Sequence, residues 1–193
     1  MRICGGVHRS RVLAAPRGTS TRPTSDRVRE ALFSVLETRG VVVGARVVDL
    51  YAGTGALGLE ALSRGATFAT FVESDRRALE ALARNVEALR ERSRARVLPF
   101  AVARAVTTLA GDAASLIFCD PPYVEVSNGG VASRLEALTK QGVAREDATI
   151  VLEHATRDRP IVAALQLTSL RETDSRVYGD TTLTFFSVYS RPP

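Results

Sequence analysis

Residues 47–58 read Val-Val-Asp-Leu-Tyr-Ala-Gly-Thr-Gly-Ala-Leu-Gly, and this stretch decides the fold. Its apolar start predicts a buried strand, its glycines predict a tight turn, and its last residues predict the first turn of a helix. Gly53, Gly55 and Gly58 form a G-x-G-x-x-G pattern, which lets the backbone approach a bound nucleoside and lets the helix pack closely on the strand. Alone the pattern is weak evidence, so a cofactor site needs support from acidic residues elsewhere in the chain.

Strands and helices alternate along the chain on both sides of this turn. This order predicts an α/β, Rossmann-like fold: a parallel sheet with helices on both faces and a ligand at the carboxyl ends of its strands. The C-terminal part has no crossover helix, so we expect it to add an antiparallel hairpin formed by 166–171 and 181–189. The expected strands are 46–51, 68–72, 95–100, 115–119 and 149–153, and the expected helices are 56–64, a segment after Asp75, a short one ending near Leu109, and 131–140.

The first forty residues do not follow this alternation. We therefore expect two domains, a basic N-terminal extension with a helix over 1–40 and the Rossmann-like domain over 41–193. Within the extension the sequence predicts a hairpin or a pair of small strands over 2–13, an exposed loop over 14–21, and an amphipathic helix from the capping residues 23–26 to about residue 40.

The net charge of +5 is concentrated at the N-terminus. Seven of the 26 basic side chains and two of the 21 acidic ones fall in residues 1–30, so the rest of the chain is balanced. Arginine binds phosphate bidentately and stacks on bases, which favours a nucleic-acid partner over the alternative of a solvated tail. His8 is interpreted as a surface histidine near phosphate rather than as a catalytic or metal-binding group. The expected RNA-binding residues are Arg2, His8, Arg9, Arg11, Arg22, Arg27 and Arg29.

The bulk composition is that of a globular protein, with 45% apolar and 24% charged residues. Cys4 and Cys119 are far apart and have no ligand-like spacing, which indicates a reducing compartment and neither a disulfide framework nor a metal site. No apolar run approaches the length needed to span a membrane. We therefore expect a cytoplasmic monomer that needs no metal.

Two acids near the glycine turn distinguish between kinds of cofactor. Glu73 follows the turn by about twenty residues, at a strand end where it could accept hydrogen bonds from ribose hydroxyls. Asp49, directly before the turn, would disfavour a bound pyrophosphate but could accept a hydrogen bond from the ammonium of a methionine moiety. The alternative is that its side chain caps loop amides. An acid that suits an ammonium and disfavours a pyrophosphate indicates S-adenosylmethionine as the cofactor, since it carries no phosphate. The expected cofactor-binding residues are Asp49, Tyr51, Ala52, Gly53, Thr54, Gly55, Gly58, Glu73 and Ser74.

The turn Asp120-Pro121-Pro122-Tyr123 is the most specific catalytic signal. Two prolines fix a rigid turn and remove backbone donors, so that carbonyls remain available to a ligand. A substrate amino group could donate to Asp120 and to the Pro121 carbonyl, while a base stacks on Tyr123. The alternative is a plain proline turn with Tyr123 in the core. We take Asp120, Pro121, Pro122 and Tyr123 as the catalytic residues.

Four stretches together resemble the RsmD family: residues 2–6, 22–33, 49–58 and 120–123. The resemblance extends over almost the whole chain. It implies a class I S-adenosylmethionine-dependent methyltransferase with a seven-stranded sheet and an N-terminal extension. It also implies rRNA methylation at the exocyclic N2 of guanine-966 in 16S rRNA, with the small ribosomal subunit as the partner.

Two positions depart from the family pattern. Residues 101–104 read Ala-Val-Ala-Arg, where many relatives have an acid that holds the cofactor's adenine, so no adenine-binding side chain is assigned. Residues 9–11 read Arg-Ser-Arg, where relatives often have Arg-Gly-Arg. The alternative functions are an adenine-N6 methyltransferase acting on DNA or RNA, and a non-catalytic ribosome-assembly factor. A nicotinamide dehydrogenase is less favoured, because no pattern for hydride chemistry accompanies the turn.

Overall fold

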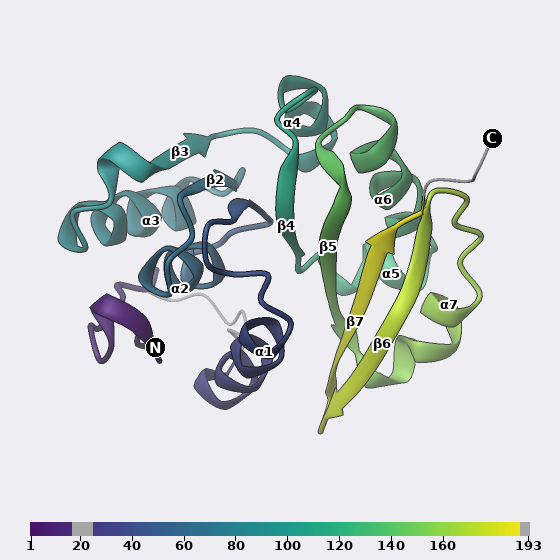
Figure 1. Cartoon of the computed structure of the whole chain (residues 1–193), viewed down its shortest axis with the longest axis horizontal. Coiled ribbons are helices and arrows are strands. Elements are labelled where there is room, and N and C mark those ends of the chain that lie inside the picture. Colours follow the sequence, from purple (N-terminus) through teal and green to yellow (C-terminus); the bar gives the residue numbers. More distant parts are fainter. Residues whose placement is uncertain (17–24, 190–193) are drawn as a thin grey trace. The chain divides into compact units, whose positions relative to one another are not determined.

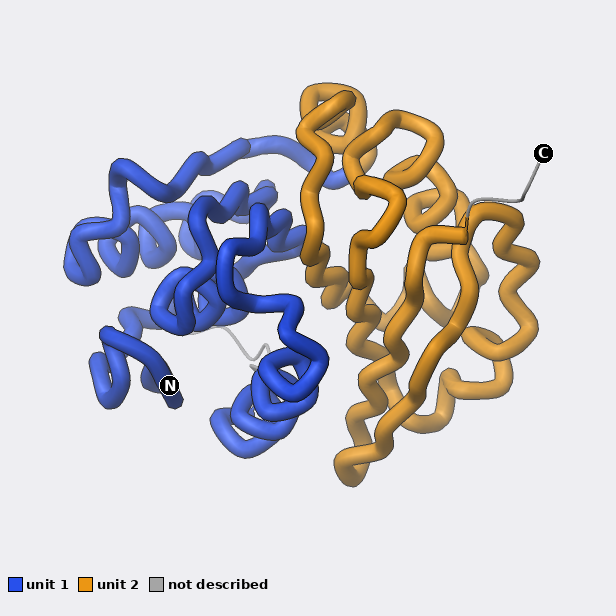
Figure 2. Tube along the Cα trace, viewed as in Figure 1, with its two compact units in different colours: residues 1–102 blue, residues 103–193 orange. Residues whose placement is uncertain are grey.

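The computed structural model describes residues 1–16 and 25–189 of the chain. Its residue contacts divide it into two compact units, Met1–Val102 and Ala103–Pro193 (Figure 2). The predicted functional division into 1–40 and 41–193 stays a prediction. In the described part of the chain, no helix has both the length and the apolar character needed to cross a membrane.

The first unit contains a parallel sheet with strand order β3-β2-β1 (Figure 1). Its central strands are buried along most of their length, as expected for parallel strands covered by helices. Helix α2 packs on β1 and β2, at the place that the glycine pattern predicts. The elements are β1 (Arg46–Leu50), α2 (Ala56–Ser63), β2 (Phe68–Val72), α3 (Arg76–Ala88), η2 (Arg92–Arg94) and β3 (Ala95–Leu98).

The N-terminal segment belongs to this same unit. Its predicted hairpin is reduced to a single bridge between Arg2 and Val12, closed by the 3-10 helix η1 (Gly6–His8). Gly6 has φ +74 and lies against Ser63, where a Cβ would collide with the Ser63 carbonyl. Backbone hydrogen bonds still join residues 1–3 to residues 10–13, so the segment pairs with itself over a short length while η1 lies against the end of α2. The predicted loop at 14–21 is described only as far as residue 16, and Arg22 lies outside the described residues.

Helix α1 (Asp26–Thr38) forms where the capping residues predict it. The Ser25 side chain accepts a hydrogen bond from the Val28 N–H and so satisfies one of the free amides of the first turn. Leu32, Phe33 and Leu36 are fully buried on one side of the helix, which confirms the predicted amphipathic face.

The second unit contains a mixed sheet with strand order β4-β5-β7-β6. Strands β4 and β5 are parallel, and β7 pairs antiparallel with both β5 and β6. The antiparallel C-terminal hairpin is therefore confirmed. The elements are α4 (Val102–Thr108), which begins at the unit boundary, β4 (Ala114–Cys119), α5 (Tyr123–Ser127), α6 (Val131–Lys140), β5 (Ala144–Ala155), η3 (Thr156–Asp158), α7 (Arg159–Ala163), β6 (Leu170–Tyr178) and β7 (Thr181–Val188).

The first strand of the hairpin was predicted over 166–171 but covers Leu170–Tyr178, so it begins four residues later and ends seven residues later than predicted. The late start has an identifiable cause. Glu136 on α6 is the physical reason. Its carboxylate accepts hydrogen bonds from the Thr168 and Ser169 amides, at 2.6 and 3.0 Å, and from the Thr168 hydroxyl at 2.8 Å. The amides that a strand would use for pairing are thus taken by a side chain from a distant helix.

Replacing Glu136 should make the fold less stable at neutral pH. Burial acts to raise the pKa of this carboxyl, but the hydrogen bonds from Ser169 and Thr168 outweigh it and hold the pKa at about 2, against an ordinary 4.5. The carboxylate therefore stabilises the fold fully above pH 4.5, and that contribution is lost as the pH falls from 4.5 to 2. We expect Glu136→Gln to lower the free energy of unfolding at pH 7 by about 2 kcal/mol.

Urea unfolding between pH 7 and pH 3 checks this expectation. The difference in unfolding free energy between the wild-type protein and Glu136→Gln should shrink as the pH falls. Glu146→Gln is the matched control, since it changes an exposed carboxylate of the same unit and should alter stability by less than about 0.5 kcal/mol. Equal losses of unfolding free energy in Glu136→Gln and Glu146→Gln at pH 7 would contradict the stabilising role of the Glu136 carboxylate.

Candidate functional site

The three glycines of the turn have different surroundings. Gly55 has φ +80 and begins α2, and an added Cβ there would collide with the Leu82 side chain. Gly58 lies against the Phe71 ring, which likewise leaves no room for a Cβ. For Gly53, with φ +55, no described residue beyond its two chain neighbours has an atom within 4 Å of where a Cβ would stand. Two glycines thus serve close packing, and Gly53 is the one with open space beside it.

Asp49 lies buried beneath the turn. Its Oδ2 accepts a hydrogen bond from the Gly58 N–H at 2.9 Å, so it caps the first turn of α2. This is the capping geometry that the sequence left open as an alternative. Burial raises the pKa of Asp49 to about 8, the Gly58 hydrogen bond works against that rise, and the nearby charge of Glu73 adds to it. Burial therefore favours the protonated form of the Asp49 carboxyl in this structure.

Glu73 ties the end of β2 to the glycine turn. Its Oε2 accepts from the Gly53 N–H at 2.8 Å, and its Oε1 accepts from the Ser74 and Asp75 N–H groups, each at 2.7 Å. A carboxylate has about four acceptor positions, so three amides use most of its capacity. In this geometry Glu73 holds the turn in place, a role that spacing alone did not indicate.

Asn85 on α3 is a buried residue of this region that the sequence analysis missed. Its side-chain amide donates to the Thr54 carbonyl in the glycine turn, at 2.9 Å. The available signal was a polar residue on the apolar face of a helix, in line with Leu82 and Val86. Such a residue needs buried hydrogen-bond partners, which a sequence does not identify.

The Asp120–Tyr123 turn lies in the second unit, directly after β4. Asp120 is half-buried, Pro121 is buried, and Pro122 precedes the first residue of α5. Tyr123 is 54% exposed, so it is not the core residue of the alternative interpretation. The guanidinium of Arg157 lies over its ring, 5.7 Å from the centroid. Arg157 comes from η3 after β5, and the sequence analysis did not identify it.

The predicted RNA-binding residues divide into three groups. Arg2, Arg9, Arg11 and Arg27 are exposed, although Arg2 lies near Asp26 and Arg11 donates to the Ala88 carbonyl at 2.9 Å. His8 is half-buried, and its Nε2 lies 2.6 Å from Oε1 of the buried Glu91. The third group is Arg29 alone, which lies in the interior.

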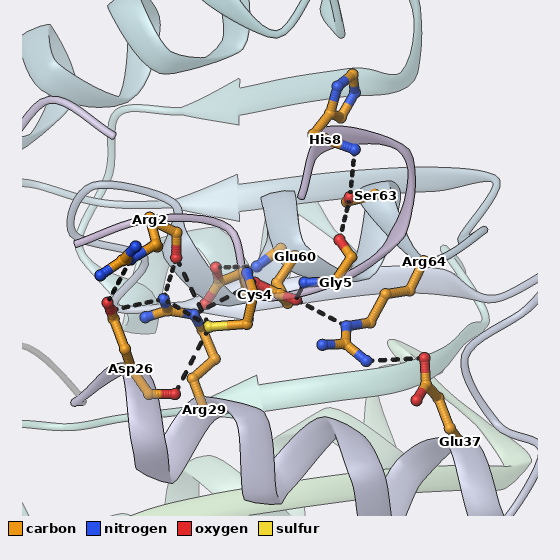
Figure 3. Close-up of polar contacts among 12 residues, drawn as sticks. Arg2, Cys4, Gly5, His8, Asp26, Arg29, Glu37, Glu60, Ser63 and Arg64 are labelled. Atoms are coloured by element: carbon orange, nitrogen blue, oxygen red, sulfur yellow. Dashed lines mark hydrogen bonds and ion pairs between the residues drawn. The ribbon is translucent and has the colours of Figure 1, made fainter. Parts of the chain in front are cut away.

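Arg29 corrects the prediction that all the N-terminal arginines face RNA. Its side chain is fully buried, and it donates to the Arg2 carbonyl, to Asp26 at 2.9 Å and to Glu60 at 3.4 Å (Figure 3). A buried guanidinium needs such partners. Arg29 therefore holds the N-terminal segment against α1 and α2 and is not available to RNA in this structure.

Glu60 of α2 is the centre of this cluster. It accepts hydrogen bonds from the Cys4 and Gly5 amides at 2.7 and 2.8 Å, and from the Arg64 Nε at 2.7 Å (Figure 3). The glycine turn and the N-terminal segment are thus attached to opposite ends of the same short helix. Within residues 1–16 and 25–189, no group of three or more His, Cys, Asp or Glu side chains could hold a metal ion.

Comparison with known proteins matches the chain to one family over almost its whole length. The family model described as conserved hypothetical protein 95 matches residues 1–187. "Putative rRNA methyltransferase YlbH" of Bacillus subtilis is 34% identical over 193 residues, covering 99% of both chains. "Ribosomal RNA small subunit methyltransferase D" of Escherichia coli strain K12 is 39% identical over 155 residues, covering 79% of this chain and 74% of that protein.

A solved structure supports the fold. "Putative methyltransferase yhhF from Escherichia coli" is similar to this chain with a TM-score of 0.81 and 32% identity, and the match covers 99% of each chain. The predicted fold class, an α/β methyltransferase with seven strands, is therefore confirmed.

Proposed function

Because the chain belongs to the family of ribosomal RNA small subunit methyltransferase D, we propose that it methylates the exocyclic N2 of a guanine, guanine-966, in 16S rRNA, with S-adenosylmethionine as the donor. Membership of this family makes the chain an S-adenosylmethionine-dependent RNA methyltransferase. The observation that supports this substrate is the turn after β4, in which a half-buried Asp120 is followed by two prolines and an exposed Tyr123.

The glycine turn has the properties that this donor needs. Gly53 leaves open space beside the backbone, and neither Asp49 nor Glu73 suits a phosphate-bearing cofactor. Asp49 would hold the methionine ammonium, and Glu73 would accept from the ribose hydroxyls. S-adenosylmethionine supplies an electrophilic methyl group on a positively charged sulfur.

The residues after β4 would position the acceptor amine. Asp120 and the Pro121 carbonyl accept its two hydrogens, which directs the nitrogen lone pair toward the methyl group. Tyr123 stacks on the ring of the target base, which must leave its own stack to enter the site. Asp120 can then take the proton that the methylated amine releases. Much of the rate enhancement would come from this positioning.

The exposed arginines of the N-terminal segment would bind the RNA backbone. Arg9 and Arg11 lie between η1 and the bridge of Arg2 with Val12, on a segment whose backbone is hydrogen-bonded to Gly6, His8 and Ile3. His8 would support these contacts indirectly. Its Nε2 lies 2.6 Å from Oε1 of Glu91, and this contact holds the turn that carries Arg9. Phosphate contacts of this kind set the position of an RNA without reading its sequence.

Cofactor affinity should depend on pH through Asp49. With a pKa of about 8, the free carboxyl is mostly protonated at pH 6, whereas a bound ammonium favours its ionised form. Binding must then release a proton, so we expect the Kd for S-adenosylhomocysteine to fall by up to about tenfold per pH unit between pH 6 and pH 8.

Calorimetry at a series of pH values measures this effect. Asp49→Asn should bind S-adenosylhomocysteine more weakly and without the pH dependence. The wild-type protein with 5′-methylthioadenosine, which lacks the amino acid part, is the control and should bind with a nearly constant Kd. A flat profile for S-adenosylhomocysteine in the wild-type protein would rule out an ammonium contact at Asp49.

The proposed reaction is tested by locating the methylated nucleotide. The protein is incubated with small ribosomal subunits that lack the modification and with labelled S-adenosylmethionine, and the label is mapped by nuclease digestion and nucleoside analysis. We expect N2-methylguanine at guanine-966. Label on the N6 of an adenine would support the adenine-N6 alternative, and RNA binding without any transfer would support an assembly factor.

A further inference from the structure

Asn85 connects two backbone segments that are far apart in the sequence. Its Nδ2 donates to the Thr54 carbonyl at 2.9 Å and to the Ala14 carbonyl at 3.1 Å, and its Oδ1 accepts from the Ala14 N–H at 2.7 Å. The side chain is 2% exposed, so these three bonds are made away from solvent. The two hydrogens of one amide group are thus divided between two different segments.

Each of these segments belongs to a different function. Thr54 lies in the glycine turn, between Gly53 with its open space and Gly55 at the start of α2. Ala14 ends the N-terminal segment that carries Arg9 and Arg11, and it begins the stretch of sequence that leads to the arginines at 17 and 22. Asn85 therefore lies between the residues proposed to hold the donor and those proposed to hold RNA.

We infer that Asn85 couples the two sites, so that a molecule bound at the glycine turn raises the affinity of the N-terminal segment for RNA. This inference rests on the proposed function. The amide can keep all three hydrogen bonds only while Thr54 and Ala14 hold their present positions. A ligand that restricts the Thr54 peptide also restricts Ala14, so less conformational entropy remains to be lost when RNA binds.

Other hydrogen bonds of the N-terminal segment go to side chains outside the glycine turn. Cys4 and Gly5 bind the Glu60 side chain, and the His8 amide donates to the Ser63 hydroxyl at 2.9 Å. These contacts lie farther along α2. They should therefore survive a change at Asn85, which makes the coupling separable from the attachment of the segment.

The test compares the RNA affinity of wild-type protein and Asn85→Asp with and without saturating S-adenosylhomocysteine. The probe is a 16S rRNA fragment that contains guanine-966. Aspartate keeps one acceptor for the Ala14 amide but places an oxygen against the Thr54 and Ala14 carbonyls. We expect S-adenosylhomocysteine to tighten RNA binding about fivefold or more in the wild-type protein, and by less than about twofold in Asn85→Asp.

Two further measurements separate coupling from general damage. Asn128→Asp is the matched control, because Asn128 is an exposed residue whose Oδ1 accepts from the Gly130 amide, and it should leave the coupling unchanged. Asn85→Ser removes the contacts without adding a charge and should also uncouple the sites. Hydrogen exchange at the Ala14 amide should slow when S-adenosylhomocysteine binds wild-type protein, and should not change in Asn85→Ser.

The possible failures are distinguishable. If wild-type protein binds both molecules but each without effect on the other, this inference is wrong while the proposed function stands. The same holds if Asn85→Asp and Asn85→Ser keep the full coupling. If the wild-type protein binds neither RNA nor S-adenosylhomocysteine, the proposed function is itself overturned, and the inference falls with it.

Discussion

Replacing Asp120 with Ala is expected to lower the methylation rate on the order of a hundredfold or more while leaving the Kd for S-adenosylhomocysteine nearly unchanged. Asp120 is proposed to accept from the amine only, whereas the donor is held by Asp49, Glu73 and the backbone at Gly53. Single-turnover transfer of labelled methyl to small subunits measures the rate, and calorimetry measures the affinity.

A conservative variant separates the two roles of Asp120. Asp120→Asn keeps an acceptor oxygen but cannot take a proton, so it should retain more activity than Asp120→Ala if positioning dominates. Asp147→Ala is the control, since Asp147 is an exposed carboxylate of the same unit, paired with Arg145. Normal turnover by Asp120→Ala would show that the carboxylate has no part in the reaction.

Replacing Glu60 with Ala should cause the largest loss of stability, about 3–5 kcal/mol. The fully buried carboxylate accepts from the Cys4 and Gly5 amides and from two guanidinium groups, those of Arg29 and Arg64 (Figure 3). Its removal takes one carboxylate partner from the buried Arg29 guanidinium. It also leaves the Cys4 and Gly5 amides without their acceptor. Urea unfolding gives the free energy directly.

The control for this variant lies in the same cluster. Glu37 pairs with Arg64 at 2.9 Å, but it is about half-exposed, so Glu37→Ala should cost less than about 1 kcal/mol. Glu60→Gln keeps the shape and part of the hydrogen bonding and should fall between the two. A Glu60→Ala protein as stable as Glu37→Ala would contradict the structure of the N-terminal cluster.

The fold was predictable because local patterns and tertiary structure agree along most of the chain. Strand β2 and helix α6 have the bounds that were predicted, and β1, β4 and α2 differ by one residue at an end. Strand β5 is longer than predicted, Ala144–Ala155 instead of 149–153, and β3 ends two residues early, at Leu98. Two other differences arise where a side chain distant in sequence intervenes. Glu136 takes the amides at 168–169 and delays β6, and the predicted N-terminal hairpin is shortened by η1, whose Gly6 lies against Ser63.

The residues of the candidate site stay a prediction, and the structure gives several of them contacts that the sequence did not indicate. Asp49 and Glu73 were expected to receive ligand groups, yet both are bonded to backbone amides of the glycine turn. Arg29 looked like its neighbours in sequence, although α1 turns it toward Glu60 and the interior. Arg157 carries no local pattern, and the position of Asn85 on the apolar face of α3 does not identify its partners, because the partners of both residues are more than thirty residues away.

The measurement that tests the central claim most directly is a crystal structure with S-adenosylhomocysteine bound. We expect its ribose at Glu73, its ammonium at Asp49 and its sulfur facing residues 120–123. A molecule that is bound elsewhere, with its sulfur far from Asp120 and Tyr123, would contradict the proposal that methyl transfer takes place at this turn.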